Sequence, residues 1–308
     1  MKGWLAADIG GTKLSAAAYD GKTLLARGQI ETRPEKGHAD VLERLACLLE
    51  TTANEAGIEP VALGIACPGP LSATRGVVEH APMLGWHDVP VVKILSERLG
   101  IPAILENDAN AAALGEQRMG AGQGCASMAY ITVSTGVGCG IVLDGHIWQG
   151  RHESAGEIGH LVIHPGDLEC PCGRRGCLEL YASGTAIGRE AKKLAASQGL
   201  DPEKMDAREA SRLAREGREE YRALFDSAGE ALGQGIAALQ QLLDVERIVI
   251  GGSVSASMDL IQPALVRSAQ SASYWADHPE NWLFLAKLQP DSGLYGAACL
   301  AADRYPIL

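Results

Sequence analysis

Two segments of the sequence share one layout, with Asp-Gly pairs that lie 124 residues apart. In each segment a short apolar run ends in a glycine-rich loop and a second apolar run follows. The Asp-Gly pair then predicts a tight hairpin turn into a third strand, so the layout is that of a three-stranded meander. The first segment spans residues 4–30 and the second spans residues 129–147. We interpret them as the two copies of a duplicated α/β lobe with a cleft between the copies, and two unrelated hairpins are the alternative.

Helical and strand patterns alternate along the rest of the chain. Residues 39–56 carry apolar side chains at helical spacing, and residues 61–66 form a short apolar run. A longer apolar stripe over residues 224–243 predicts a helix. Three glycines would let another element approach this helix closely: Gly229, Gly233 and Gly235. The charged stretch of residues 203–222 alternates in sign and is interpreted as a solvated helical surface without a function of its own.

This alternation of helix and strand predicts α/β architecture in two lobes. We place a small lobe at residues 1–118 plus 294–308 and a large lobe at residues 119–293. A nucleic-acid partner is not expected, because 38 acidic residues outnumber 27 basic ones and give a net charge of −11. Neither a membrane span nor a signal peptide is expected from the pattern of apolar runs, so we expect a soluble, cytoplasmic protein.

Glycine-rich loops supply candidate phosphate contacts. Residues 8–13 read DIGGTK, in which Asp8 ends a predicted strand, Gly10 and Gly11 free backbone N–H groups to face an anion, and Thr12 adds a hydroxyl donor. Residues 134–140, STGVGCG, offer the same chemistry, and the glycine turn of residues 250–255 could pack on an adenine ring. Neither of the first two loops is a Walker A motif. They are interpreted as a clamp on a nucleotide polyphosphate, and plain hairpin loops are the alternative.

A candidate catalytic carboxylate lies in residues 105–116, LENDANAAALGE. The alanine-rich run favours a helix, which places Asp108 at or near the N-cap. A carboxylate at that position could accept the proton of a sugar hydroxyl as the hydroxyl attacks phosphorus, with Asn107 as a second hydrogen-bonding group. A plain helix cap is the alternative.

A cluster of metal-binding residue types occupies residues 157–179. Three thiolates and one imidazole form a closed tetrahedral set that is typical of structural zinc: His160, Cys170, Cys172 and Cys177. His164 is a rival ligand, and free thiols are the alternative. The second ring nitrogen of His160 could donate a hydrogen bond to a substrate hydroxyl. Glu157 and Glu179 bracket the cluster and suit the vicinal hydroxyls of a hexose, or they are surface acids.

These segments together resemble the ROK family (repressor, open reading frame, kinase). The matching motifs follow the family's order over nearly the whole chain: DIGGTK, PGP at residues 68–70, ENDAN, STGVGCG, EIGH, CPCGRRGCLE, IGGSV and GLYGAA. The resemblance implies a two-lobed actin-like ATPase (ribonuclease H-like) fold with a central cleft and a zinc-binding loop. It also implies transfer of a phosphoryl group from ATP with Mg²⁺ to a hexose 6-hydroxyl, structural Zn²⁺ and a homodimer.

The resemblance also assigns roles to individual residues. Asp108 would be the catalytic base on the 6-hydroxyl. The residues that would hold the sugar are Gly69, Asn107, Asp108, Glu157, His160 and Glu179. The residues that would face the ATP phosphates are Asp8, Gly10, Gly11, Thr12, Lys13, Thr135 and Gly136. Gly252 would lie near the nucleoside.

The motif sequences are most similar to those of the N-acetylmannosamine kinases of the family. The glucokinases of the family share most of these motifs, so glucokinase remains an alternative function, as does N-acetylglucosamine kinase. Glucokinases often read Asn-Leu where this chain has Met83 and Leu84, and loss of that amide argues against strict glucose specificity. A sugar-sensing repressor of the family would carry a helix-turn-helix ahead of the phosphate loop, and none is expected before Asp8. A non-catalytic regulator should lack the base, which Asp108 supplies.

Overall fold

The computed structural model describes residues 1–272 and 274–307. The chain forms two compact units. Unit 1 contains Met1–Ala126, Gly140–Ala155 and Ala286–Leu308, and unit 2 contains Ser127–Cys139 and Gly156–Leu285. The lobe boundaries given above stay a prediction.

The first sheet has five strands in the order β3-β2-β1-β4-β8. Their bounds are β1 (Lys2–Ile9), β2 (Lys13–Tyr19), β3 (Leu24–Glu31), β4 (Glu59–Cys67) and β8 (Ala103–Asn107). Strands β1, β2 and β3 form an antiparallel meander, whereas β4 runs parallel to both β1 and β8. The meander predicted from the first glycine loop and Asp-Gly turn is confirmed.

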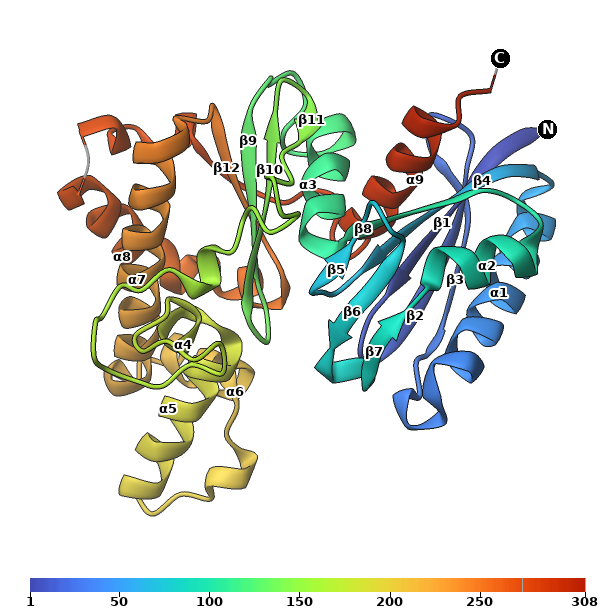
Figure 1. Cartoon of the computed structure of the whole chain (residues 1–308). Helices are drawn as coiled ribbons and strands as arrows, with labels where there is room; N and C mark the ends of the chain where they lie inside the picture. Colours follow the sequence, from blue (N-terminus) through green and yellow to red (C-terminus); the bar gives the residue numbers. More distant parts are fainter. Residues whose placement is uncertain (273, 308) are drawn as a thin grey trace. The chain divides into compact units, whose positions relative to one another are not determined.

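Alternation along β1 builds two apolar layers in unit 1. Leu5, Ala7 and Ile9 pack with α1 (Gly37–Ala56) and α2 (Val91–Leu99) on one face. Trp4 and Ala6 pack with α9 (Ser292–Arg304) on the other face. Figure 1 shows α9 beside this sheet. Because successive strand side chains point to opposite faces, one apolar strand supplies both layers. A smaller sheet of β5 (Leu71–Ser72), β6 (Val77–Ala81) and β7 (Trp86–Val89) also belongs to this unit.

The second five-stranded sheet has the order β11-β10-β9-β12-β13. Its strands are β9 (Met128–Val133), β10 (Val137–Leu143), β11 (His146–Ile147), β12 (Arg247–Gly251) and β13 (Leu283–Leu285). As in the first sheet, a three-strand meander is followed by strands that join it in parallel, since β12 runs parallel to β9 and β13. Counted along the chain, the strands of each sheet lie in the order third, second, first, fourth, fifth. This shared order supports the interpretation of a duplicated lobe.

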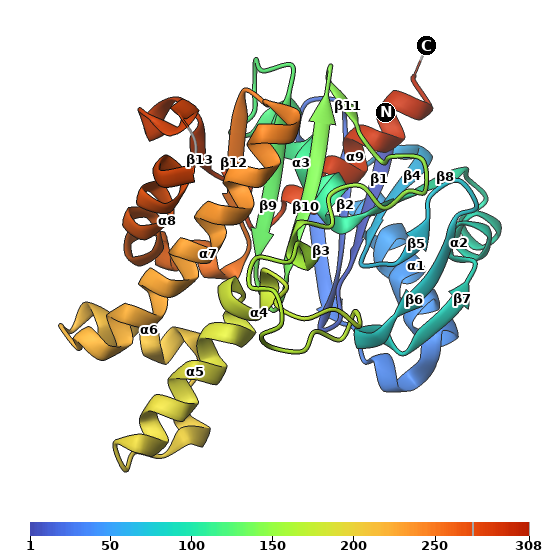
Figure 2. The ribbon, with the colours of Figure 1, turned by 60° about the vertical axis from the view of Figure 1, so that its left-hand side comes forward.

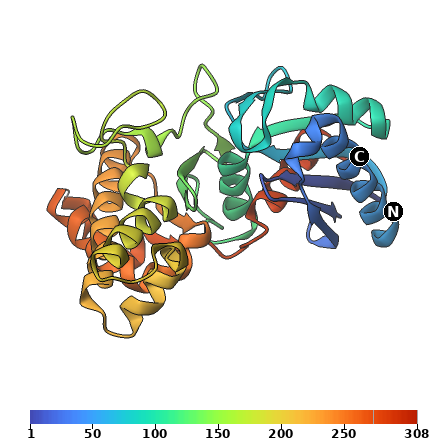
Figure 3. The same ribbon diagram turned by 90° about the horizontal axis from the view of Figure 1, so that it is seen from below.

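The helices of unit 2 are α4 (Glu179–Ala182), α5 (Gly184–Ser197), α6 (Ala207–Arg215), α7 (Glu219–Leu243) and α8 (Met258–Ala272). Figure 2 shows α7 beside α8, and in Figure 3 the yellow to orange helices of this unit gather into one bundle. A Cβ added at Gly229 or Gly233 would lie 2.5 Å from a backbone oxygen of α8, so both glycines permit the predicted close approach. No helix in the described part of the chain is long and apolar enough to cross a membrane.

Candidate functional site

The start of α3 (Asp108–Met119) presents the candidate catalytic carboxylate. The capping residue is Asn107, whose side-chain oxygen accepts the backbone N–H groups of Ala109 at 2.9 Å and Asn110 at 3.3 Å. Asp108 occupies the first helical position instead, where its side chain is exposed and Oδ1 accepts the N–H of Ala109 at 2.9 Å. Because Asn107 already serves as the cap, capping alone does not account for the carboxylate at Asp108.

Gly69 lies beside the same capping residue. A Cβ added at Gly69 would lie 3.7 Å from Nδ2 of Asn107 and only 2.9 Å from the backbone nitrogen of Leu71. A side chain at position 69 would therefore crowd the turn and approach the Asn107 amide. In unit 1 the structure brings together two of the residues predicted to hold a sugar.

The DIGGTK segment forms a closed loop between β1 and β2. The N–H of Gly10 donates to the carbonyl of Lys13 at 2.9 Å, and the carbonyl of Thr12 accepts the N–H of Thr32 at 3.0 Å. Thr12 and Lys13 are exposed, so their polar groups are available to an anion. Asp8 is half-buried at the end of β1. Burial and the nearby Asp108 carboxylate raise its pKa to about 7, against the opposing effect of Lys13.

The raised pKa of Asp8 predicts a pH dependence of stability. Between about pH 4 and pH 7 the unfolded chain ionises at this position while the folded chain keeps the proton, so ionisation destabilises the folded protein as pH rises. Asp8→Asn should therefore raise the free energy of unfolding at pH 8 by about 2–4 kcal/mol and leave it nearly unchanged at pH 4. Urea unfolding of the ligand-free protein at both pH values measures this difference.

Asp20→Asn is the matched control for this measurement. The pKa of Asp20 is lowered because its carboxylate accepts the backbone N–H groups of Thr23 and Lys22, so loss of its charge should reduce stability. An Asp8→Asn variant that is less stable than the parent at pH 8 would contradict the expectation.

Met83 lies directly over the DIGGTK loop. A Cβ added at Gly11 would lie 3.1 Å from both Cβ and Cε of Met83. The adjacent Leu84 is buried, whereas Met83 is 58% exposed. Met83, the residue that replaces the Asn of the Asn-Leu pair, therefore borders the phosphate loop, where it presents a thioether in place of an amide.

The four predicted metal ligands converge in unit 2. One ligand atom from each of them lies within 4.8 Å of the others: His160, Cys170, Cys172 and Cys177. Cys170 Sγ lies 3.6 Å from His160 Nδ1, and Cys172 Sγ lies 3.6 Å from Cys177 Sγ. Tetrahedral zinc with sulfur at ~2.3 Å and nitrogen at ~2.0 Å requires ligand atoms roughly 3.5–3.8 Å apart. The donor set and its spacing fit zinc bound through Nδ1.

His164 belongs to a different contact. Its ring packs edge-on against Tyr181 with ring centroids 4.7 Å apart, and its carbonyl lies where a Cβ on Gly176 would fall, at 1.8 Å. The bare, left-handed Gly176 therefore allows the loop to close behind His164. The structure supports His160 as the ligand and leaves His164 outside the cluster.

Two of the predicted sugar-binding carboxylates border the metal cluster. Glu179 Oε1 lies 3.6 Å from His160 Nδ1, and Glu157 Oε2 lies 3.9 Å from Nε2 of the same ring. Gly136 of the second glycine loop also approaches, because a Cβ there would lie 3.1 Å from Glu179 Oε2. In unit 2, His160, Glu157, Glu179 and Gly136 therefore belong to one neighbourhood.

Removal of one thiolate tests the metal assignment. Cys172→Ser should reduce bound zinc from about one equivalent to less than about 0.2 and lower the melting temperature, since a structural zinc site contributes to folding free energy. Elemental analysis of purified protein together with thermal unfolding measures both effects. Cys47→Ser is the control, because Cys47 is exposed and lies outside the cluster. Parent protein that holds no zinc would overturn the assignment.

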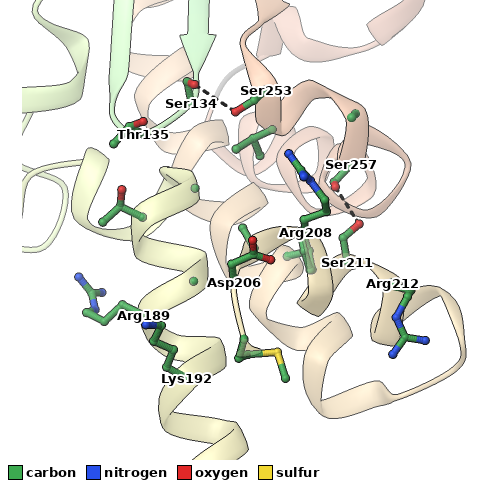
Figure 4. A pocket seen from close by; sticks show the side chains of 18 of the residues that line it. Ser134, Thr135, Arg189, Lys192, Asp206, Arg208, Ser211, Arg212, Ser253 and Ser257 are labelled. Carbon is green, nitrogen blue, oxygen red and sulfur yellow. Dashed lines mark hydrogen bonds between the residues drawn. The ribbon is translucent and has the colours of Figure 1, made fainter. Parts of the chain in front are cut away.

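A pocket of about 1020 Å³ opens in unit 2 (Figure 4). The second glycine loop contributes Ser134 and Thr135, and the segment after Gly252 contributes Ser253 and Val254. Two hydroxyl pairs hold parts of its wall together: Ser134 with Ser253 at 3.0 Å, and Ser211 with Ser257 at 2.8 Å. A Cβ added at Gly252 would lie 2.3 Å from the carbonyl oxygen of Val133, so only glycine permits this turn beside β9.

Part of the charged stretch of residues 203–222 lines this pocket, through Asp206, Arg208, Ser211 and Arg212. The three charged residues are exposed, as expected of a solvated surface. Whether this stretch has a function of its own stays a prediction. A helix that borders an open pocket carries the same charged residues as a solvated helix, so the sequence holds no signal that separates the two.

Comparison with known proteins supports the resemblance drawn from the motifs. The profile of the ROK family matches residues 4–304. The chain belongs to the ROK family. It has the family's two-lobed actin-like α/β fold with two mixed sheets and a Cys₃His cluster, as expected from the sequence.

Sugar kinases of the ROK family match this chain over nearly its whole length. Glucokinase of Thermotoga maritima is 33% identical, with 96% of each chain covered. N-acetylmannosamine kinase of Escherichia coli is 34% identical, with 97% of this chain and 98% of the relative covered. A crystal structure of ROK family glucokinase from Streptomyces griseus, in complex with glucose and AMPPNP, is 31% identical with a TM-score of 0.84 and covers 98% of this chain and 99% of that one. The match identifies a sugar kinase of the ROK family.

Proposed function

We propose that the protein is an ATP-dependent hexose kinase that phosphorylates the 6-hydroxyl, with glucose as the first candidate substrate. The observation that carries the proposal is the exposed Asp108 carboxylate at the start of α3, in the same unit as the closed DIGGTK loop. The similarity to glucokinases, one of them crystallised with glucose and AMPPNP, favours glucose and ATP.

In the proposed reaction Asp108 accepts the proton of the sugar 6-hydroxyl as its oxygen attacks the γ-phosphorus of ATP and the bond to the ADP oxygen breaks. Backbone N–H groups of the DIGGTK loop and the side chains of Thr12 and Lys13 face the phosphates, together with Thr135 and Gly136 from the second loop. Mg²⁺ bound to the phosphates would neutralise the charge that develops on them.

The residues proposed to contact the sugar are Gly69, Asn107, Asp108, Glu157, His160 and Glu179. With zinc on Nδ1, the His160 ring keeps its proton on Nε2 and can donate it in a hydrogen bond to a sugar hydroxyl. The proposed role of zinc is to fix the orientation of that ring. The homodimer stays a prediction.

We assign the nucleoside of ATP to the pocket between Thr135 and the segment after Gly252. Of the five basic side chains that line this pocket, four belong to ion pairs: Arg189, Lys192, Arg212 and Arg215. The fifth, Arg208, forms no ion pair within residues 1–272 and 274–307. A cation without a carboxylate partner is the one most readily recruited by an anionic ligand.

Arg208→Ala should therefore raise the KM for ATP by about 5- to 20-fold, because a charge-assisted contact to the nucleotide is lost. The KM for the sugar should stay within about 2-fold of the parent value. Steady-state kinetics measures both constants. Arg212→Ala is the matched control, because Arg212 already pairs with Glu209 and Glu216. This variant should change the KM for ATP by less than about 2-fold. Equal effects of the two variants would contradict the assignment.

N-acetylmannosamine is the second candidate substrate, favoured by Met83 over the phosphate loop. Identity does not separate the candidates, since the two kinases are 33% and 34% identical to this chain. The crystal structure of a related glucokinase with glucose and AMPPNP makes glucose the leading candidate, so the preference for N-acetylmannosamine drawn from the motifs is not supported.

A coupled ADP-release assay with Mg·ATP tests the function. Glucose, mannose, N-acetylmannosamine, N-acetylglucosamine, fructose and allose are ranked by kcat/KM. A lead for glucose supports the proposal. If kcat/KM is highest for N-acetylmannosamine and Met83→Asn reverses this preference, the kinase function stands and the sugar selectivity is assigned to Met83. If folded, zinc-loaded protein releases no ADP with any of these sugars, the proposal is overturned.

A further inference from the structure

Glu106 has a buried carboxyl group that the mechanism above does not use. It lies at the end of β8, two positions before Asp108, and is 4% exposed. Its Oε1 accepts the N–H of Asn107 at 2.8 Å and Nδ2 of Asn110 at 2.9 Å, and its Oε2 accepts Nε2 of Gln149. All three donors are neutral, and no ion pair in the described part of the chain includes Glu106. A buried carboxyl group is costly unless such donors satisfy it.

Three of these residues, Glu106, Asn107 and Asn110, are joined in a closed ring of hydrogen bonds, and they flank Asp108 in the chain. Glu106 holds the backbone of Asn107, the side chain of Asn107 holds the backbone of Asn110, and the side chain of Asn110 returns to Glu106. Asp108 lies between Asn107 and Asn110 in the chain and is exposed. The backbone that carries the proposed base is therefore fixed on both sides by groups that depend on the Glu106 carboxyl.

The other oxygen of Glu106 reaches a loop distant in sequence. Gln149 follows β11, and its carbonyl accepts the N–H of Ala155 at 3.0 Å, which closes residues 149–155 into a compact loop. Glu153 in this loop has a left-handed backbone, and its carboxylate accepts the N–H of Thr74 at 3.1 Å. The loop is thus anchored at two points of unit 1, and one of them is Glu106.

We propose that Glu106 is a positioning residue for phosphoryl transfer. Its carboxyl group holds the turn of Asn107 and Asp108 in place and joins that turn to the Gln149 loop. The inference rests on the proposed kinase function. A base that is displaced by a fraction of an ångström loses much of its rate contribution while substrate binding survives, so the effect of Glu106 falls on kcat rather than on KM.

Exchanging the hydrogen-bond donor and acceptor between Glu106 and Gln149 tests the proposal. Gln149→Glu places two acceptors face to face and should lower kcat by about 10- to 100-fold at pH 8, with KM for ATP and sugar within about 3-fold. Glu106→Gln alone should be mild, because the Gln149 amide can turn over and offer its oxygen to the new NH₂ group. The double variant Glu106→Gln with Gln149→Glu restores a donor opposite an acceptor and should return kcat to within about 5-fold of the parent value.

Thermal unfolding of each variant and the parent's own turnover separate the possible failures. Glu97→Gln, an exposed glutamate of unit 1, is the control for charge removal. The proposal is overturned if Gln149→Glu turns over as fast as the parent, or if Glu106→Gln fails to restore it. It is also overturned if kcat of the folded fraction is constant and only the melting temperature falls, because that marks a purely structural role. A parent protein that phosphorylates no hexose overturns the proposed function instead.

Discussion

Asp108→Asn should lower kcat by about 10²- to 10⁴-fold, the usual contribution of a general base, while sugar binding stays within about 3-fold of the parent affinity. The amide keeps the size of the side chain and removes the acceptor of the 6-hydroxyl proton. Its oxygen can still accept the N–H of Ala109, so the start of α3 should stay intact. Single-turnover kinetics with a separate sugar-binding titration measures the two effects independently.

Asn107→Asp is the informative companion to this variant. Its carboxylate can still cap the N–H groups of Ala109 and Asn110, which the Asn107 oxygen holds in the parent. Loss of the Asn107 amide should raise the KM for sugar and leave the proton acceptor in place. A kcat for Asp108→Asn within 5-fold of the parent would remove Asp108 from the role of base.

Glu116→Gln should cost about 3–5 kcal/mol of unfolding free energy, the largest stability effect we expect from an isosteric change. Glu116 is fully buried on α3. Its Oε1 accepts the N–H of Leu288 and the hydroxyl of Ser292, each at 2.8 Å. Its Oε2 accepts the N–H groups of Ala121 at 2.8 Å and Lys287 at 3.0 Å. Either orientation of a glutamine amide points its NH₂ at one or two of these N–H donors.

Urea unfolding at pH 7 measures this loss, with Glu97→Gln as the exposed control expected within about 0.5 kcal/mol of the parent. Gly120 shows how tightly the carboxylate is enclosed, because a Cβ there would lie 2.0 Å from Oε2. A loss below about 1 kcal/mol would mean that the segment before α9 does not depend on Glu116.

Local sequence patterns were sufficient for the α/β class, whereas the actin-like fold was expected from the resemblance to the ROK family. The apolar runs and Asp-Gly turns predicted the meander of β1, β2 and β3, since strand period and turn chemistry depend on residues close in sequence. The metal ligands were also predictable, because Cys170, Cys172 and Cys177 lie on one short loop whose glycines let it close. The sequence favoured His160 over its rival His164 as the fourth ligand, and the structure brings His160 together with the three cysteines while His164 packs against Tyr181.

The sequence by itself determined the fold class, the residue types of the predicted metal ligands and the candidate carboxylate at Asp108, because each depends on residues that are neighbours along the chain. The tertiary structure alone decided that Asn107 is the cap, that Met83 rather than Leu84 covers Gly11, and that α6 lines a pocket. It also joined Glu106 to Gln149 and Glu116 to Leu288, partners 43 and 172 residues apart. Such contacts follow from packing between elements, for which short-range periodicity and spacing carry no information.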